Sequence, residues 1–408
     1  MINDAAKTVL LIGTLDTKQD EYEFARARFH SAGLKTMLVN AGVLGETSLE
    51  VAVSSSQVAA AAGISLEVLR ESQDRGNAIS VMSLGATLVV QSLFTEGRFD
   101  GIFALGGSGG STVASASMRS LPIGIPKVLV STLVNSNGMM FVGESDMALF
   151  ASVVDIAGIN VISSQIISQA VDAMVGMINS KSERSRSAKR LVAASMFGVT
   201  TECVTNARKK IETHGYEVIT FHMTGSGGRS MEKLISEGFI HGVLDVTTTE
   251  ICDEIVGGVL SAGPTRLTAG SAQGIPQVIS LGALDMVNFG ARDSVPNKFA
   301  RRNLYAHNEN VTLMRTSAQE CEKIALDICS KLSHAKGPIS LFIPLKGVSS
   351  IAVKGAPFHD PQADDALFST FRRHIPQNVE LIELDNAIND AEFSKALAAQ
   401  LITYLDRS

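Results

Sequence analysis

Short apolar runs recur along the first half of the chain, most of them ending in glycine, with helix-compatible segments between them. The runs are TVLLIG (8–13), LKTMLVNAG (34–42), FDGIFALGG (99–107) and GIPKVLVST (124–132). Runs that are apolar throughout are typical of strands buried on both faces of a parallel sheet. Since helices are expected between them, we predict a parallel sheet covered by helices on both faces.

The segments between the runs carry signals for helix ends. The first predicted helix continues to His30, and Gly33 can end it. A longer helical stretch spans 56–96, and we expect interruptions near Gly76 and Gly85.

The second half of the chain repeats the order of apolar runs and glycines found in the first half. Three pairs of segments match in order: 190–225 with 8–42, GFIHGVLDV (238–246) with RFDGIFALG (98–106), and GIPQV (274–278) with GIPKV (124–128). One such match could arise by chance, whereas three in the same order suggest two topologically related halves.

The segment NSKSERSRSAKR (179–190) separates the two halves. The apolar pattern stops there and the charge density rises, which predicts a domain linker; a solvated helix end is the alternative. We therefore expect a nucleotide-binding domain over 1–180 and a second domain over 191–408, on the substrate or partner side. The predicted fold class is α/β, with two Rossmann-like subdomains whose mainly parallel sheets face a cleft.

Composition limits the classes of partner. With 408 residues, 45% apolar and 19% charged residues and a net charge of −6, the chain has the balance of a globular protein without a basic nucleic-acid footprint. The apolar stretch 153–178 carries Asp155 and Asp172, so we predict a buried or amphipathic helix and no membrane span. The four cysteines show neither a CxxC pair nor zinc spacing, which favours core thiols in a cytoplasmic protein.

The segment IFALGGSGGS (102–111) joins a predicted strand to a predicted helix. Glycines allow close approach of a ligand to the backbone, and a helix N-terminus offers free N–H groups to phosphate. We therefore predict a phosphate-binding loop, not a flexible linker, made of Gly106, Gly107, Ser108, Gly109, Gly110 and Ser111. It is neither a GxxxxGK[ST] loop nor a GxGxxG fingerprint, because Thr112 stands at the third glycine position.

The segment GTLDTK (13–18) ends another strand at the same expected edge of the sheet. Thr14 and Thr17 offer hydroxyls, Lys18 a cation for phosphate and Asp16 a carboxylate for Mg²⁺. Gly13 begins this predicted cofactor-binding segment, for which an ordinary capped turn is the alternative. Two further acids, Glu144 and Asp146, are metal candidates, with the first turn of a helix as the alternative.

In the second half, polar residues also follow predicted strands. Another glycine loop, TGSGGRS (224–230), offers Arg229 as an anion clamp. We expect Glu250, Asp285 and His307 to act as acids or bases. The expected substrate-binding residues are Thr247, Thr248, Thr249, Asn288 and Arg315. For each residue a structural role with satisfied hydrogen bonds is the alternative.

The segment FHDPQADDALF (358–368) contains a histidine and several aspartates. A metal cluster is one interpretation. We favour a helix start with Asp360 as N-cap and Pro361 in the first position.

Long motifs in the chain resemble an uncharacterised family of ATP-binding proteins. They are GTLDTK, ALGGSGGS, DVTTTE, GIPQV with ALDMVNFG, and HNENVTLMRT with PLKGVSSI. The same module forms the N-terminal half of the plant tobamovirus-resistance inhibitor, and the resemblance runs from about Thr8 to the end. One departure is Glu309, where the family has proline. The resemblance implies ATP binding by two Rossmann-like subdomains, and it suggests as partner a TIM-barrel protein resembling phosphoenolpyruvate hydrolases.

Two classes of function follow. The first is an ATP- and Mg²⁺-dependent enzyme acting on a small polar or anionic metabolite in the cleft between the domains. The second is a nucleotide-dependent regulatory or protein-interaction module without catalysis of its own. We also expect a homodimer or higher homo-oligomer, because 153–178 is more apolar than one helix of a two-layer domain usually hides.

Overall fold

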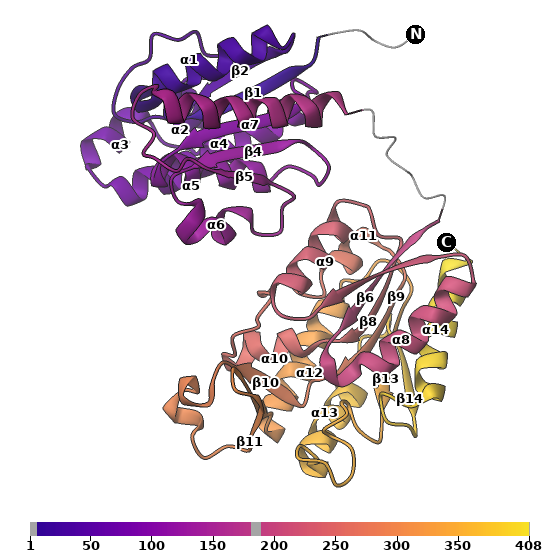
Figure 1. Ribbon diagram of the computed structural model, residues 1–408. Coiled ribbons are helices and arrows are strands. Elements are labelled where there is room, and N and C mark those ends of the chain that lie inside the picture. Colours follow the sequence, from indigo (N-terminus) through magenta and orange to yellow (C-terminus); the bar gives the residue numbers. More distant parts are fainter. Residues whose placement is uncertain (1–5, 181–188, 408) are drawn as a thin grey trace. The chain divides into compact units, whose positions relative to one another are not determined.

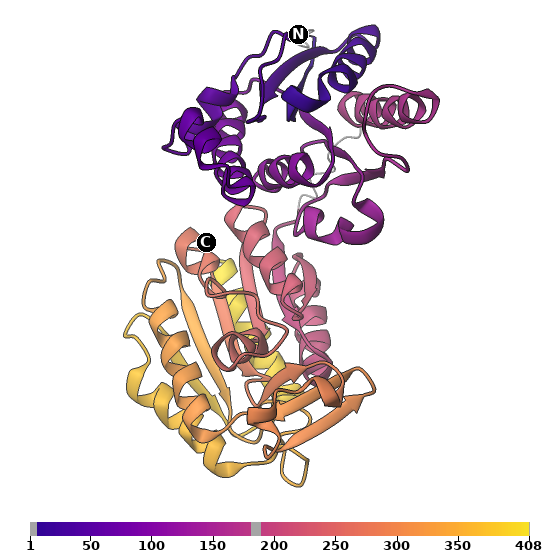
Figure 2. The same ribbon diagram turned by 90° about the vertical axis from the view of Figure 1, so that its left-hand side faces the viewer.

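The structure is a computed structural model that describes residues 6–180 and 189–407. The contacts divide the chain into two compact units, Met1–Arg184 and Ser185–Ser408. The predicted linker lies mostly outside the described residues. Figures 1 and 2 show both units, which are described one at a time below.

Unit 1 contains a parallel five-stranded sheet of order β2-β1-β3-β4-β5. Its strands are β1 (Thr8–Gly13), β2 (Lys35–Asn40), β3 (Gly101–Gly106), β4 (Lys127–Ser131) and β5 (Ala148–Ala151). The middle strands β1, β3 and β4 are almost fully buried, as their uniformly apolar sequences predict.

Helices cover both faces of this sheet (Figure 1). On one face, α1 (Leu15–Ser31) and α7 (Val161–Asn179) pack on alternate residues of β1 and β3. The other face is covered by α2 (Ser55–Ala61), α3 (Leu66–Ser72), α4 (Arg75–Thr95), α5 (Ser108–Arg119) and α6 (Val134–Val142). The alternation of side chains along each strand produces these two separate cores.

Two helix predictions in unit 1 were wrong in part. α4 continues through Gly85, where an interruption was expected, because Gly85 packs against α2: a Cβ there would lie 1.9 Å from the carbonyl oxygen of Val58. The apolar stretch 153–178 is helical only from Val161. α4 and α7 are long and apolar enough to cross a membrane by length and composition, yet both contribute buried residues to the cores of unit 1.

Unit 2 repeats this architecture with one more strand. Its parallel sheet has the order β14-β13-β9-β8-β6-β7, so β7-β6-β8-β9 corresponds to β2-β1-β3-β4. The strands are β6 (Leu191–Met196), β7 (Glu217–His222), β8 (Gly242–Thr247), β9 (Gln277–Gly282), β13 (Ile339–Pro344) and β14 (Glu380–Leu384). The predicted α/β class with two Rossmann-like, mainly parallel halves is confirmed.

The helices of unit 2 also lie on both faces (Figure 2). One face carries α8 (Thr201–Thr213) and α14 (Ala391–Leu405). The opposite face carries α9 (Ser226–Ser236), α10 (Thr249–Val256), α11 (Ala269–Gln273), α12 (Ala318–Leu332) and α13 (Pro361–His374). Asp360 caps α13 through its side chain, which accepts from the amides of Gln362 and Ala363, as predicted.

A separate antiparallel sheet in unit 2 was not predicted. It has the order β10-β12-β11, with β10 (Met286–Phe289), β11 (Leu304–Asn308) and β12 (Val311–Arg315). It is inserted between β9 and α12, and the turn at Asn308–Asn310 joins two of its strands. The four cysteines are free and buried, in agreement with the expectation of core thiols.

Candidate functional site

The strand order of unit 1 creates a switch point between β1 and β3. The chain leaves β1 toward the β2 side and leaves β3 toward the β4 side, and ligands of open α/β sheets bind where such connections diverge. Both predicted ligand loops, 13–18 and 106–111, begin there. They lie in contact, since a Cβ on Gly110 would be 3.5 Å from Oγ1 of Thr14.

Tyr22 fixes the two central strands beneath these loops. Its buried hydroxyl contacts the carbonyl oxygen of Ile12 in β1 and accepts a hydrogen bond of 3.0 Å from the amide of Leu105 in β3. Burial raises the pKa of this hydroxyl well above its usual value. A Cβ on Gly13 would lie 2.0 Å from the same oxygen. Gly13 therefore makes room for Tyr22, which is a structural reason for a glycine predicted to bind cofactor.

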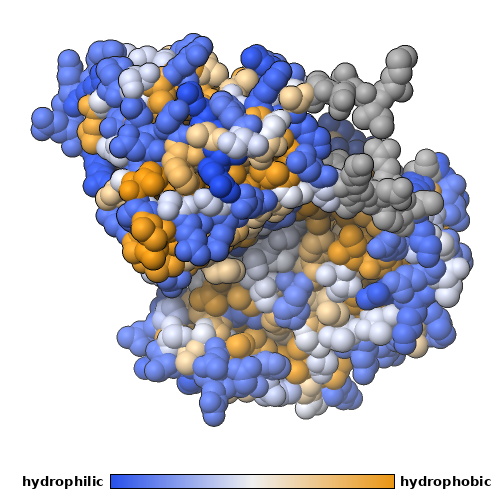
Figure 3. Space-filling model, turned by 45° about the horizontal axis from the view of Figure 1, so that its top comes forward, coloured by the Kyte–Doolittle hydropathy of each residue, from blue (hydrophilic) through white to orange (hydrophobic). Residues whose placement is uncertain are grey.

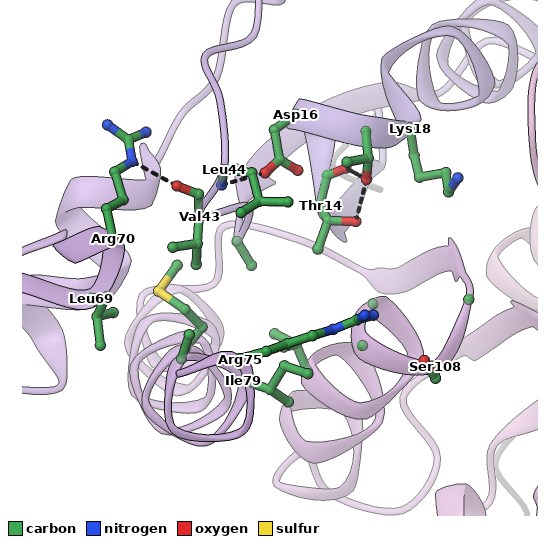
Figure 4. A pocket seen from close by; sticks show the side chains of 18 of the residues that line it. Thr14, Asp16, Lys18, Val43, Leu44, Leu69, Arg70, Arg75, Ile79 and Ser108 are labelled. Atoms are coloured by element: carbon green, nitrogen blue, oxygen red, sulfur yellow. Dashed lines mark hydrogen bonds between the residues drawn. The ribbon is translucent and has the colours of Figure 1, made fainter. Parts of the chain in front are cut away.

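A cavity of about 840 Å³ opens at the switch point (Figure 4). Its lining comes from the two loops, from the segment after β2, from the starts of α4 and α5, and from the residues after β4 and β5. One end is apolar, lined by Val43, Leu44, Leu69, Ile79 and Met82, and the middle is cationic and rich in backbone amides.

Two cations face the middle of the cavity. Arg75, in the first turn of α4, extends toward Ser108 at the start of α5, and Lys18 lies on the α1 side (Figure 4). Among the described residues neither has a hydrogen-bond or ion-pair partner. Lys18 also has non-helical dihedral angles (φ −131°, ψ 26°), which separate the turn at 15–17 from the rest of α1.

The start of α5 supplies the amides. Gly107 precedes the helix without a side-chain cap, so the first N–H groups of α5 are left for a ligand. A glycine in such a loop can provide positive φ or close approach of a ligand to the backbone. Positive φ is not its role here, because no glycine from Gly106 to Gly110 has positive φ. A Cβ on Gly109 would meet Ile79 at 3.4 Å, which is ordinary contact. The fold thus permits a side chain at Gly109, and its absence keeps the cavity open.

The hydroxyls of the two loops have different surroundings. Ser111 is fully buried and donates to the Gly106 carbonyl and to Oγ of Ser131 at 3.1 and 2.7 Å, so it joins β3 to β4. The hydroxyls of Thr14 and Thr17 lie 3.2 Å apart, and both residues line the cavity, as does the exposed Ser108.

Asp16 and Arg70 hold the apolar end of the cavity in place. Oδ2 of Asp16 accepts from the amide of Leu44 at 2.8 Å, and Nε of Arg70 donates to the Val43 carbonyl at 2.6 Å. The side chain of Leu44 is 84% exposed although it lines the cavity, so it is available to a ligand. Sequence reasoning missed this end because it consists of ordinary apolar residues from three separate segments.

The three predicted metal ligands are not brought together. Oδ1 of Asp16 is buried and has no hydrogen-bond partner among the described residues, so one carboxylate oxygen remains for a cation. Asp146 precedes β5, at the opposite edge of the sheet, and forms an ion pair of 2.6 Å with Lys127. Glu144 lies in the same loop before β5. Within residues 6–180 and 189–407, no group of three His, Cys, Asp or Glu side chains is arranged for a metal, the segment 358–368 included.

In unit 2 the corresponding switch point, between β6 and β8, is filled by side chains. Glu250 is fully buried just after β8, and its Oε1 accepts from the amides of Gly225 and Gly228 at 2.7 and 3.1 Å. A Cβ on Gly228 would lie 2.0 Å from Oε2. The second glycine loop therefore binds a carboxylate of the protein itself.

Arg266 neutralises this carboxylate. It is 1% exposed, donates from Nε to Glu250 at 2.8 Å and from both terminal nitrogens to Asp245 at 2.6 and 2.7 Å, and contacts Glu232 at 3.3 Å. Burial raises the pKa of Glu250, against the opposing effect of Arg266. Sequence reasoning missed Arg266, which no local motif marks.

The remaining candidates of unit 2 are mostly buried and internally bonded. Thr247, Thr248 and Thr249 are fully buried and hydrogen-bonded to neighbouring strands and connecting segments. Asn288 donates to Asp253 at 2.6 Å, and its own Oδ1 is buried without a partner in the described part of the chain.

Arg315 lies close enough to Asp285 for its positive charge to oppose the effect of burial on the pKa of that carboxyl. Arg315 donates to the carboxylate of Asp364 in α13 at 2.5 Å. Burial raises the pKa of Asp285 to about 6, and Ser349 donates to its Oδ2 at 2.8 Å. His307 is exposed on β11. No hydrogen bond or ion pair of the described residues joins Glu250, Asp285 and His307.

Comparison with known proteins identifies relatives along the whole chain. A protein from Clostridium tetani described as a UPF0261 protein is 48% identical over 402 residues, covering 98% of this chain and 100% of that protein. The ToMV resistance protein Tm-1(GCR237) of Solanum lycopersicum is 38% identical over 422 residues; the match covers 98% of this chain and 56% of the tomato protein.

Similarity to solved structures is weak. The UDP-N-acetylglucosamine 2-epimerase from Rickettsia bellii matches with a TM-score of 0.24 and 12% identity, over 67% of this chain and 78% of that one. Family models match both units: the N-terminal domain of the uncharacterised protein family UPF0261 over residues 7–183 and its C-terminal domain over 189–405. The chain belongs to the uncharacterised protein family UPF0261.

Proposed function

We propose that unit 1 binds ATP in the cavity at the β1–β3 switch point. The observation that carries this proposal is the layout of that cavity: an apolar end formed after β2 and by α3 and α4, followed by two unpaired cations and the open N-terminus of α5. A flat, apolar nucleobase fits the first part, and a polyphosphate fits the second.

The part of the cavity proposed to hold the phosphates is lined by positively charged groups and hydrogen-bond donors. Lys18 and Arg75 would pair with phosphate oxygens, and the amides at Ser108–Gly110 would donate to them at the positive end of the α5 dipole. Without a side chain at Gly109, phosphate oxygens can reach these amides. Thr14 and Thr17 add hydroxyl donors beside Lys18.

Mg²⁺ would accompany the nucleotide. It usually retains several waters and binds one or two carboxylates together with phosphate oxygens, so a single protein ligand is sufficient. Asp16 fits this role through its unpartnered Oδ1, whereas its Oδ2 holds Leu44. Bound Mg²⁺ would neutralise charge on the phosphates and would favour phosphoryl transfer.

We propose further that the protein is an ATP-dependent enzyme acting on a small metabolite. The alternative, a nucleotide-dependent regulatory module, is favoured by one observation. The residues proposed to act in unit 2 are largely buried and bonded to the protein, with Glu250 and Arg266 filling its switch point. A partner protein would then bind according to whether ATP is present in unit 1. Our candidate for this partner is a TIM-barrel protein.

Titration calorimetry with ATP and Mg²⁺ on the full chain tests the proposal. Lys18→Ala and Arg75→Ala should each weaken binding at least tenfold, about 1.4 kcal/mol. Lys35→Ala is the matched control, because Lys35 is an exposed lysine at the amino end of β2, whereas the cavity lies at the carboxyl ends of the strands. Equal affinity of all four proteins would refute the assignment of the phosphate end.

A further inference from the structure

A second, smaller hollow adjoins the main cavity of unit 1. Its volume is about 250 Å³, and it lies beyond the carboxyl ends of β4 and β5. It shares Thr132, Leu133 and Asp155 with the main cavity. The rest of its lining is Asn135, Ala151, Ser152, Val153 and Val154. The two spaces therefore meet along the residues that follow β4 and at Asp155.

The loop that carries Asp155 is held in a strained conformation. Val153 has a φ of 62°, which is a genuine outlier for a β-branched residue. The amide of Val154 donates to the carbonyl of Ser152, which closes a three-residue turn, and the amide of Ser152 donates to the Ser131 carbonyl at 3.1 Å. Because Val153 is 76% exposed, side-chain packing does not explain this strain.

The lining of the hollow indicates the charge of its ligand. The polar residues of its lining are Thr132, Asn135, Ser152 and Asp155, and the described residues that line it include no lysine, arginine or histidine. The Ser152 hydroxyl donates to the Val154 carbonyl at 2.6 Å. One oxygen of Asp155 accepts from the amide of Ile156 at 2.8 Å, and the other has no hydrogen-bond partner among the described residues. This surface complements hydroxyl groups of a neutral molecule and repels a carboxylate or phosphate.

We propose that this hollow is the acceptor subsite of the same nucleotide site, and that it binds a small neutral polyhydroxylated metabolite. The inference rests on the proposed ATP site. Along the sheet edge, the apolar end lies on the β2 side, the cationic part at β1 and β3, and the hollow at β4 and β5. A nucleotide bound in this direction has its terminal phosphate between Lys18 and Thr132.

This order of base, phosphate and acceptor subsites predicts a phosphoryl transfer from ATP to the acceptor. A hydroxyl oxygen of the acceptor forms a bond to the γ-phosphorus of ATP, and the bond from that phosphorus to the β–γ bridging oxygen breaks, so that ADP leaves with the electron pair. The free carboxylate oxygen of Asp155 takes the hydroxyl proton. Thr132 can donate to, or accept from, the acceptor. Of the polar or anionic metabolites expected from the sequence, this subsite favours a neutral polar one.

The experiment measures two quantities on the full chain: ATP affinity, and transfer from γ-labelled ATP to acceptors. The acceptors are glycerol, erythritol, xylitol and glucose, with glycerate and gluconate as charged counterparts. Asp155→Asn should reduce transfer at least 100-fold. Asn135 lines the small hollow and not the main cavity, so Asn135→Phe should reduce transfer as strongly without weakening ATP binding. Asp172→Asn, at an exposed aspartate on α7, is the control and should change neither quantity.

The possible results distinguish failure of the acceptor subsite from failure of the proposed ATP site. Transfer to a neutral acceptor that both hollow variants lose, while Asn135→Phe binds ATP as the wild type does, supports the subsite. Two results overturn this inference and leave the proposed ATP site standing. In the first, the wild type binds ATP but transfers phosphate to no neutral acceptor. In the second, Asp155→Asn transfers phosphate as well as the wild type does. Wild-type protein that does not bind ATP overturns the proposed function, and the acceptor subsite with it.

Discussion

Nε of Arg266 lies 2.8 Å from Oε2 of Glu250, and both side chains are buried in unit 2. The pair occupies the switch point that in unit 1 is an open cavity. The four-strand order shared by the two units therefore has different surroundings at this point: unit 1 leaves backbone amides free there, whereas unit 2 satisfies the amides of its glycine loop with its own carboxylate. This contrast is the reason for proposing that unit 1 binds the ligand.

The first prediction concerns the stability of unit 2. Arg266→Ala leaves Asp245 and Glu250 buried without their cation, which should lower the free energy of unfolding by about 3–5 kcal/mol. Arg208→Ala removes an exposed pair with Glu212 and should change it by about 0.3–0.5 kcal/mol. Urea unfolding of the full chain measures both variants. An equally small effect in both would contradict the structural role of the cluster.

The second prediction is a pH dependence of stability. Burial raises the pKa of Asp253 to about 7 and that of Asp285 to about 6, from ordinary values near 3.8. Between the ordinary and the raised pKa each of these two carboxyls binds more protons in the folded than in the unfolded protein. Their contribution to stability is therefore fully present below about pH 4 and is lost as pH rises to about 6 for Asp285 and about 7 for Asp253. Each group contributes about 1.4 kcal/mol per pH unit in that window.

A substitution isolates this effect. Asp285→Asn stays neutral at every pH, so its unfolding free energy should fall less than that of the wild type between about pH 4 and about pH 6, the range bounded by the ordinary and the raised pKa of Asp285. Asp293→Asn, at an exposed aspartate of the same unit, should follow the wild type. Identical pH profiles for the three proteins would show that Asp285 does not titrate in this range.

The third prediction separates two glycines of unit 1 that the sequence treats alike. Gly109→Val places a side chain where the protein leaves room, so it should weaken ATP binding at least tenfold and change the melting temperature little. Gly13→Val collides with Tyr22 and should lower stability by about 1–3 kcal/mol. Thermal unfolding together with calorimetry distinguishes them. Reduced stability with unchanged affinity in Gly109→Val would make the loop an ordinary turn.

Much of the fold could be predicted because its signals are local. Buried strands such as 8–13 and 101–106 are apolar throughout and end in glycine, and their order repeats in the second half. The continuity of α4 at Gly85 depends on contact with Val58, which no local pattern reveals. The antiparallel sheet was missed although Asn308–Asn310, between two apolar stretches, is a hairpin signal.

The site was predictable only where it lies in contiguous motifs. GTLDTK and GGSGGS both reach the cavity because strand topology brings β1 and β3 together. Arg75 and Asp155 follow no motif and reach the same cavity from distant segments. In unit 2 the sequence predicted a substrate site where the structure has an internal ion-pair cluster. The arginine that neutralises Glu250, Arg266, lies 16 residues further along the chain, and nothing in the sequence marks it as a partner.

The fourth prediction concerns oligomeric state. The buried face of α7 packs within unit 1, so the apolar surface available to a second copy is smaller than the sequence suggests. Exposed apolar residues remain near its start, with Val161 at 81% and Val153 at 76% exposure. Apolar residues also gather in patches between larger hydrophilic areas on the face shown in Figure 3. We propose that the surface around Val161 joins two copies.

Light scattering tests this proposal. The wild type should have twice the chain mass of 43.1 kDa at micromolar concentration, and Val161→Glu should shift it toward one chain. Leu326→Glu, at an exposed leucine on α12 of the other unit, is the control and should keep the wild-type mass. A wild type with the mass of one chain would rule out the dimer.

The most direct test of the central claim is amide hydrogen exchange of the full chain with and without ATP and Mg²⁺. Binding at the open switch point should slow exchange in the segments that form the cavity of unit 1, at 13–18, 41–44, 75–82 and 107–113, and leave the glycine loop at 224–230 unchanged. Protection around 224–230 or 247–251 in its place, or no protection anywhere at saturating ATP, would contradict the assignment of the nucleotide site to unit 1.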